Sequence, residues 1–258
     1  TNLYYANPRS VSLSGGGWRM AGFEMIPSIA ATSGVVRDAW THALLANAQI
    51  AFTATSGSLT GTVVDGSVIL TSFRTNWVSA ANGQFPASIV LGACNWNLSV
   101  SLAGYQTNTL VNAVSNVAAG ASVALGTTYL VPVDANSNGI ADAWEALFFP
   151  SGTTPAADPD GDGLNNQQEY LCGTDPTNAL SVLRFLDSSV ETNTPTLTWS
   201  VVAGRSYQIL AATSLVTFAA AATNGPWEAA YGQSTLQWSD TNAASYPARF
   251  YRVRLKAP

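Results

Sequence analysis

Two segments with the same spacing of oxygen-bearing side chains constrain this chain more than any other feature. They begin at Asp134 and, 24 residues later, at Asp158. Each segment has Asp or Asn at its first, third and fifth positions, Gly at the sixth, Asp or Asn at the ninth and Glu at the twelfth. Such a loop surrounds one hard cation with oxygen atoms, because the seventh residue adds its backbone carbonyl and the Glu adds both carboxylate oxygens. We therefore predict two Ca²⁺ sites.

The ligands of both sites follow from these positions. For loop one we predict Asp134, Asn136, Asn138, Ile140, Asp142 and Glu145. For loop two we predict Asp158, Asp160, Asp162, Leu164, Asn166 and Glu169. Ligand charge and loop rigidity set calcium affinity. Loop two has four of these carboxylates against three in loop one, and Pro159 stiffens it, so we expect loop two to bind more tightly.

An alternative interpretation treats the two segments as turns between helices, because Asp, Asn and Gly are common turn residues. It leaves the Glu at the twelfth position of both segments unexplained. The distribution of charge favours the calcium interpretation. Only 10% of the residues are charged, yet eight of the fifteen acidic residues lie between Asp134 and Asp175. Carboxylates placed this close together repel one another unless a cation lies among them.

Composition also limits the classes of partner. The ten basic residues are scattered and form no motif for nucleic acid, so we expect no DNA or RNA partner. No apolar run reaches the length of about 18 residues that spans a bilayer, so we predict no membrane span. The chain starts at Thr1, and we expect a removed signal peptide or a trimmed chain. Because weak calcium loops of this kind suit extracellular calcium levels, we predict an extracellular or cell-surface location.

The two cysteines leave two possibilities open. Cys94 and Cys172 can form one disulfide, which would close a loop of about 77 residues and stabilise the fold by roughly 4 kcal/mol. Alternatively, both are buried thiols that behave as small apolar side chains.

The rest of the chain has the pattern of a mainly β fold, with alternating apolar residues and frequent Gly, Asn and Asp turns. Trp96, Leu98 and Val100, for example, alternate with polar residues and predict a strand with one buried face. We predict two β-sandwich domains joined by a small α-helical calcium-binding module. The predicted parts are a β-extension at 1–32, a sandwich at 33–132, a double calcium-loop module at 133–179 and a second sandwich at 180–258. The extension either adds strands to the following domain or is donated to a neighbouring subunit.

Residues 33–132 resemble a known family. The segments that carry the resemblance are Gly34–Asp38, Leu45–Phe52, Ala81–Phe85 and Leu91–Tyr105. They are similar to the carboxypeptidase regulatory-like (transthyretin-like) β-sandwich, with an inserted hairpin around Asp65-Gly66, a favoured two-residue turn. The resemblance implies a structural or cell-surface module without catalysis.

The calcium region has helices predicted at Asp142–Phe149 and Leu164–Cys172, with Gly173 as a C-cap. A strand at Tyr129–Val133, and not a helix, precedes loop one, and the apolar residue lies at the seventh position of each loop. These features are similar to dockerin or thrombospondin type 3 repeats. The C-terminal part resembles a fibronectin type III-like domain. The order of the three resemblances along the chain is similar to that in large secreted bacterial surface proteins. The predicted strands of the C-terminal part are Thr196–Ser200, Gly204–Leu210, Leu236–Asp240 and Ala248–Leu255.

The inventory of catalytic groups is small. His42 is the one histidine, and no second group is placed with it by any recognisable nucleophile or zinc spacing. We therefore predict that the protein is not an enzyme. Trp40, Trp77 and Trp227 fall in predicted loops or strand ends, where they could stack on a sugar. Core positions are predicted for Trp96, Trp199 and Trp238.

The function predicted from the sequence is a secreted calcium-binding structural or adhesive protein, with calcium rigidifying the joint between domains. It would be a subunit of an extracellular fibre, filament or cell-surface assembly. The expected partners are further copies of the chain, as a homopolymer, or other cell-surface proteins, with a glycan as a possible ligand. The alternative is a non-catalytic accessory region of a larger secreted hydrolase that binds carbohydrate or the cell envelope.

Overall fold

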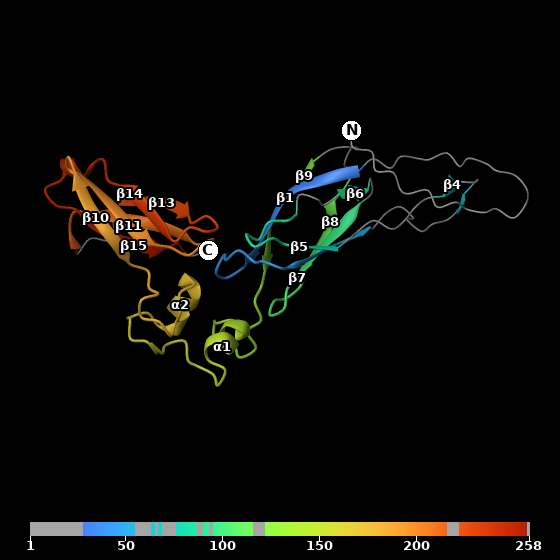
Figure 1. Cartoon of the computed structure of the whole chain (residues 1–258), viewed down its shortest axis with the longest axis horizontal. Coiled ribbons are helices and arrows are strands. Elements are labelled where there is room, and N and C mark those ends of the chain that lie inside the picture. Colours follow the sequence, from blue (N-terminus) through green and yellow to red (C-terminus); the bar gives the residue numbers. More distant parts are fainter. Residues whose placement is uncertain are drawn as a thin grey trace, which may run out of the picture. The chain divides into compact units, whose positions relative to one another are not determined.

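The computed structural model describes residues 28–54, 63–64, 67–68, 76–86, 90–92, 95–115, 122–215 and 222–256. The chain is mainly β, as predicted, with two short α-helices in the described part (Figure 1). It divides into two compact units. Unit 1 consists of Thr1–Val36, Leu45–Ala103 and Thr107–Leu130. Unit 2 consists of Arg37–Leu44, Gly104–Gln106 and Val131–Pro258.

Unit 1 contains two sheets and a small hairpin. The first sheet has the order β5 (Asn76–Val78), β2 (Gln49–Ala54), β7 (Trp96–Ser101) and β8 (Asn108–Val114). The second has the order β6 (Val90–Gly92), β1 (Ser28–Asp38) and β9 (Ser122–Leu130). The hairpin pairs β3 (Val63–Val64) with β4 (Ser67–Val68) in an antiparallel manner. Val64 pairs with Ser67, which confirms the hairpin predicted around Asp65-Gly66.

The core of unit 1 follows the alternation of its strands. In β7, Leu98 and Val100 are fully buried, whereas Asn97 and Ser99 on the other face are partly exposed. Leu98 lies opposite Phe52 of β2 in the antiparallel register, so the apolar faces of the two strands coincide. Apolar residues that alternate in this way can pack on one face of a sheet only. The predicted strand with one buried face is therefore confirmed.

Three details of unit 1 differ from the sequence-based expectations. Trp77 is 4% exposed and packs edge-to-face on Phe52 with ring centroids 5.8 Å apart, so its assignment as a sugar-stacking residue is wrong. The strand expected at Tyr129–Val133 ends at Leu130, and only an isolated bridge between Tyr105 and Pro132 follows. Strand β1 begins at Ser28, so it runs across the boundary expected at residues 32 and 33.

Unit 2 contains the calcium segment and a C-terminal pair of sheets. The helices of the calcium segment are α1 (Asp142–Phe148) and α2 (Asn166–Cys172). One sheet has the order β10 (Phe185–Glu191), β11 (Thr194–Ser200) and β14 (Thr235–Ser239). The other has the order β13 (Ala222–Glu228), β12 (Ser206–Ala212) and β15 (Phe250–Leu255). A 3₁₀ turn at Ala243–Ser245 lies between β14 and β15.

The two C-terminal sheets enclose one core, which gives a β-sandwich. Its centre is Trp199 of β11, which is fully buried, together with Tyr207 and Ile209 of β12. Trp227 and Trp238 pack against this cluster and against each other, with ring centroids 6.4 Å apart. Trp199 is a core residue as predicted. Trp227, for which we predicted possible stacking on a sugar, is partly buried and packs against the core.

Helices and strands were predicted unevenly in unit 2. Strands β11, β12, β14 and β15 and both helices confirm the predictions, although α2 starts at Asn166 because Asn165 is its N-cap. Strands β10 and β13 were missed. All seven residues of β10 are exposed, so it has no apolar alternation, and β13 contains Gly225 and Pro226, which are typical turn residues.

Several predictions fall outside the described residues. They concern residues 1–27 of the predicted β-extension, and Cys94. Cys172 is a free thiol, half-buried at the end of α2, so the predicted alternative of a Cys94–Cys172 disulfide is not formed in this structure. Among the described residues, no helix has the length and apolar character needed to cross a membrane.

The buried and open faces of β7 predict unequal effects of two alanine substitutions. Leu98→Ala removes a fully buried side chain and should lower the free energy of unfolding of unit 1 by about 2–5 kcal/mol. Ser99→Ala, on the opposite face, should change it by no more than about 0.5 kcal/mol. Denaturant titrations followed by tryptophan fluorescence measure both values. Equal effects of the two changes would show that the face assignment of this strand is wrong.

Candidate metal centre

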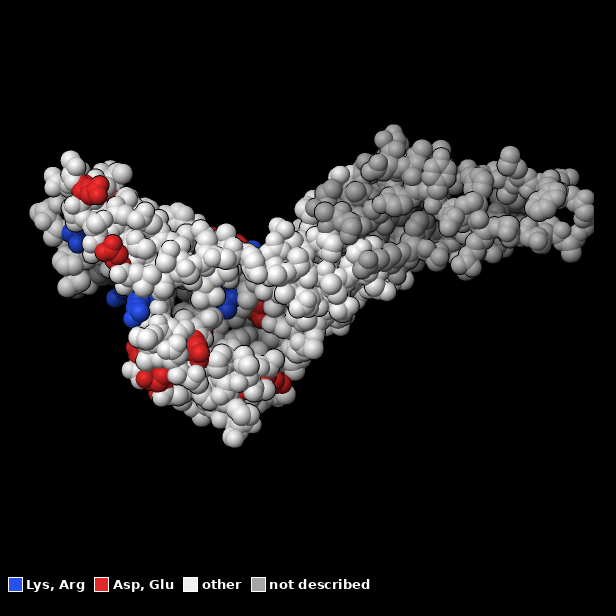
Figure 2. All heavy atoms as spheres, viewed as in Figure 1, with Lys and Arg blue, Asp and Glu red and all other residues white. Residues whose placement is uncertain are grey.

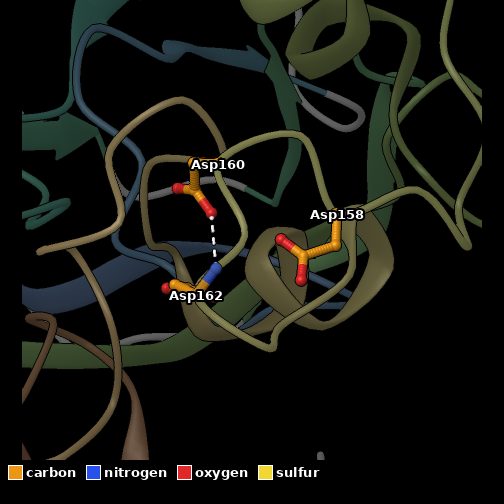
Figure 3. Close-up of side chains that lie close together, drawn as sticks. All are labelled: Asp158, Asp160 and Asp162. Atoms are coloured by element: carbon orange, nitrogen blue, oxygen red, sulfur yellow. Dashed lines mark hydrogen bonds between the residues drawn. The ribbon is translucent and has the colours of Figure 1, made fainter.

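Loop two is shaped by its own carboxylates. Both oxygens of Asp158 accept backbone N–H groups, from Gly161 at 2.9 Å and from Gly163 at 3.1 Å. Asp162 donates its N–H to Asp160 Oδ1 at 3.2 Å, the dashed bond in Figure 3. Leu164 donates its N–H to Asp162 Oδ1 at 2.7 Å. These bonds wind the chain so that Asp158, Asp160 and Asp162 have carboxylate oxygens within 4.8 Å of one another.

The two glycines are required by this winding. Gly161 has φ 75° and Gly163 has φ 97°, in the left-handed region that residues with a Cβ rarely adopt. The glycine at the sixth position of the sequence pattern is thus explained by backbone conformation.

Five buried oxygens of loop two have no hydrogen-bond partner among the residues that the structure describes. They are Asp160 Oδ2, Asp162 Oδ2, Asn166 Oδ1, Glu169 Oε1 and Glu169 Oε2. Their residues occupy the third, fifth, ninth and twelfth positions of the loop, and Glu169 contributes both oxygens. Buried polar atoms almost always have a partner, because leaving one unpaired costs about 1–3 kcal/mol. A set of five oxygens with the spacing of a calcium loop fits a bound cation as that partner.

Helix α2 delivers the last two of these ligands. Asn165 caps the helix, since its side chain accepts the N–H of Gln168 and the Gln168 side chain accepts the N–H of Asn165. Asn166 follows directly, and its Nδ2 donates to Thr153 Oγ1 at 2.6 Å and to the Thr154 carbonyl at 2.9 Å. With the amide nitrogen held in this way, Asn166 Oδ1 is left as the atom available to a cation. Asn166 and Glu169 are both fully buried.

The electrostatics of loop two also favour a cation. Burial, and to a lesser extent the charges of Asp160, Asp162 and Asp158, raise the pKa of Glu169 to about 7, although the nearby hydroxyl of Thr174 acts to lower it. Burial disfavours an ionised carboxylate, and like charges nearby do the same. A divalent cation reverses both effects, because it supplies the opposite charge directly to the oxygens. In the view of Figure 2, Asp and Glu side chains gather around the helical region of unit 2.

Loop one has a different arrangement of the same groups. Here Glu145 is buried, and its two oxygens accept side-chain N–H groups from Asn138 at 2.8 Å and Asn136 at 3.1 Å. Asp134 accepts the backbone N–H groups of Asn138 and Gly139, as the first residue of the loop should. Asp142 accepts the N–H of Ala135. The third and fifth positions of this loop therefore meet Glu145, but Asp134, Asp142 and Glu145 do not form a carboxylate cluster like that of Asp158, Asp160 and Asp162 among the described residues.

The two asparagines explain how loop one can satisfy Glu145 from within the protein. A side-chain amide carries a donor nitrogen and an acceptor oxygen in nearly the same shape. Pointing Nδ2 toward Glu145 satisfies the carboxylate, and rotating the amide points Oδ1 to the same place, where it could bind a cation shared with Glu145. Loop two has aspartates at these two positions, which have no N–H to offer. This difference agrees with the expectation that loop two binds calcium more tightly.

Both loops meet an aromatic cluster, which we define as Trp40, Ile140, Ala141, Trp144, Tyr170 and Leu171. Ile140, at the seventh position of loop one, is fully buried in it. Tyr170, which directly follows Glu169, packs edge-to-face on Trp144 and on Trp40, with ring centroids 5.8 and 6.5 Å apart. Trp40 is therefore a packing residue that is only partly buried, and its stacking on a sugar stays a prediction. Trp144 also contacts Phe148, whereas Leu147 of the same helix is 73% exposed.

A buried arginine holds the other end of α2. Arg205 is 5% exposed, and its Nε donates to the Leu171 carbonyl at 2.9 Å, next to the last residue of the helix. Gly173 ends the helix with φ 76°, and a Cβ there would lie 3.0 Å from Arg205 Nη2. Arginine near a helix C-terminus satisfies a free carbonyl and the negative end of the helix dipole. Sequence reasoning did not find this residue, because nothing around Gly204-Arg205 marks it.

Comparison with known proteins agrees with loop two. Residues 158–179 match the bacterial TSP3 repeat, a calcium-binding type of repeat. The matched residues contain the whole of loop two and helix α2, and they begin after loop one. No curated protein matches the chain.

A solved structure from Bacteroides uniformis ATCC 8492, described provisionally as a carbohydrate-binding protein, also shows similarity. The two sequences are 11% identical, and the match covers 88% of this chain and 77% of the other. The TM-score is 0.24, and at that value the likeness supports no conclusion about this chain.

The different chemistry of the two loops predicts the order of their affinities. Glu169→Gln removes a charge and one chelating oxygen from loop two, so calorimetric titration should lose the tighter Ca²⁺ site and keep the weaker one. Glu145→Gln should do the opposite. Glu191→Gln, an exposed carboxylate on β10, is the matched control and should leave both sites unchanged. Loss of the weaker site in Glu169→Gln would reverse the assignment.

Proposed function

We propose that this protein is a secreted, non-enzymatic, calcium-binding structural protein in which each loop binds one Ca²⁺. The observation that supports this most strongly is the set of five buried oxygens in loop two that have no hydrogen-bond donor. In this proposal the ligands are the twelve loop residues predicted from the sequence, with Ile140 and Leu164 contributing backbone carbonyls. The ions hold the calcium segment in one conformation and so make it a rigid connection between the predicted domains.

The packing around α2 supports a rigid connection. Glu169 lies on the same short helix as Tyr170 and Leu171, so a cation that fixes Glu169 also fixes the aromatic cluster. At the other end of the helix, Arg205 ties Leu171 to the turn before β12. A ligand that binds only the ordered state stabilises it by about 2.7 kcal/mol per site at a hundredfold excess over Kd. Two such sites would contribute a large part of the stability of a typical domain, about 5–15 kcal/mol.

The same packing is unlike that of a calcium sensor. A sensor opens an apolar groove when calcium binds. Here the apolar residues next to the loops, Ile140 and Tyr170, are already buried against one another. We infer that calcium acts on this protein by stabilising one structure.

The broader role in our proposal is that of a subunit in an extracellular fibre, filament or cell-surface assembly. Calcium outside the cell is abundant enough to occupy weak loops of this type. A chain with few charges and two β-rich parts also has the composition of a subunit that packs closely against copies of itself.

Hydrogen exchange tests whether calcium rigidifies the segment. Adding Ca²⁺ should slow exchange of the amides of α2 and of the loop at Asp38–Leu44, because both contact the aromatic cluster. In the double variant Glu145→Gln, Glu169→Gln, adding Ca²⁺ should no longer slow the exchange of these amides. Protection confined to the two loops, with α2 unchanged, would contradict the rigid connection while leaving calcium binding intact.

Electron microscopy tests the assembly. Negatively stained protein in Ca²⁺ should contain ordered filaments, and these should loosen or disappear after chelation. Single particles of uniform size in both conditions would argue against a fibre subunit and would favour the accessory role, for which glycan binding is the next measurement.

A further inference from the structure

Two edge strands of the C-terminal sandwich carry opposite charges. Within the described residues, β10 is the outermost strand of the sheet β10-β11-β14, and β15 is the outermost strand of β13-β12-β15. An edge strand presents one row of backbone N–H and C=O groups without a partner strand, so it can pair with another chain. Natural proteins usually cover or shorten such an edge.

Strand β10 is unusually open. All seven of its residues are exposed, including Leu186 at 47% and Val190 at 68%. On the side of β11 that faces the core, Leu197 and Trp199 are buried, but Ser188, which pairs with Leu197, is exposed. The core therefore ends at β11, and β10 lies beyond it with both of its faces open.

The outer faces of the two strands have matching spacing. On β10, Asp187 and Glu191 lie four residues apart and pair with Thr198 and Thr194, on the side of β11 that faces away from the core. On β15, Arg252 and Arg254 are followed by Lys256, which comes directly after the end of the strand. Arg252 and Lys256 also lie four residues apart, with Arg254 between them. All three cations are exposed and alternate with apolar residues that pack on the core, Tyr251, Val253 and Leu255. An antiparallel alignment that places Glu191 beside Arg252 also places Asp187 beside Lys256.

Charge excludes the alternatives in which an edge pairs with its own copy. Two β10 strands would bring Asp187 and Glu191 of each copy together, and two β15 strands would bring the cations together, and both arrangements are destabilising. The other two edges are less suitable. Strand β13 contains Pro226, which has no N–H to donate, and the five-residue β14 has no charged residue.

We propose that β10 of one copy of this chain pairs with β15 of a second copy. The proposal rests on the self-association included in the proposed function and identifies the surface that would carry it. Main-chain hydrogen bonds between the strands would supply affinity, as in β-strand addition. The charges would select the partner edge, because opposite charges across strands stabilise and like charges do not.

The position of the edges determines the kind of assembly. Tyr251 of β15 packs edge-to-face on Trp238 of β14 with ring centroids 6.1 Å apart, and Arg249 forms an ion pair with Asp240 just after β14. Strand β15 therefore faces β14 across the core. Strands β14 and β10 are the two outer strands of one sheet, so β15 and β10 lie on opposite sides of the sandwich. Edges on opposite sides of one sandwich cannot pair reciprocally in a closed dimer. The contact is heterologous and continues from copy to copy.

The test uses charge reversal in the full chain with Ca²⁺ present, and sedimentation velocity as the readout. The first variant is Asp187→Lys, Glu191→Lys, which makes both edges positive. The second is Arg252→Glu, Lys256→Glu, which makes the outer face of β15 predominantly negative. Each variant alone should associate at least tenfold more weakly than the unmodified chain. An equimolar mixture should recover association, because each negative edge then meets a positive edge of the other variant.

A control places the same number of lysines at a different edge. Thr235→Lys, Gln237→Lys on β14 should associate like the unmodified chain. Circular dichroism melting curves show whether each variant is folded, and recovery in the mixture cannot come from misfolded protein.

The outcomes separate this proposal from the proposed function. Association of the unmodified chain that both charge reversals leave intact overturns the β10–β15 contact and leaves the proposed assembly standing. Two monomeric variants whose mixture stays monomeric also overturn it. An unmodified chain that remains monomeric at about 100 µM, a concentration far above typical values of Kd for specific contacts, overturns both the contact and the fibre, whereas calcium binding is judged separately by calorimetry.

Discussion

The need of loop two for a cation is the constraint on which unit 2 depends. Asp158, Asp160 and Asp162 are held together by backbone N–H groups of their own loop, and Glu169 is buried beside them. Those hydrogen bonds satisfy some of the oxygens and leave five others without a donor. The same bonds that shape the loop therefore create its electrostatic cost. A divalent ion removes that cost, because it neutralises the repulsion and bonds the unpaired oxygens together.

This local requirement reaches the rest of unit 2 through one short helix. An isolated helix of seven residues is not stable in water, so α2 depends on its ends and on its packing. Its first turn contains the capping box and Glu169, which we predict to be a ligand, its middle packs Tyr170 into the aromatic cluster, and its last turn meets Arg205 and Gly173. Each group that stabilises α2 also fixes the position of a ligand, and each ligand that binds a cation stabilises α2.

Local patterns in the sequence predict structure that consecutive residues form, but they do not predict contacts between residues far apart in the chain. The spacing of Asp, Asn, Gly and Glu predicted the carboxylate cluster of loop two, because such a loop is formed by consecutive residues. Alternation predicted β7 and β11 for the same reason. By contrast, Arg205 acts on a helix 34 residues earlier in the chain, and Trp77 is buried because β5 pairs with β2. Strand β10 has no apolar face, so periodicity could not reveal it.

The low charge of the chain makes the position of each charge informative. The ten basic residues look scattered in the sequence, yet three of them lie between Arg252 and Lys256, and the structure places all three on the exposed side of β15. Arg205, the cation that contacts the calcium segment, binds a helix carbonyl instead of a ligand. In our proposals, a cation from outside binds the loops, and the charges on β10 and β15 distinguish one sheet edge from another.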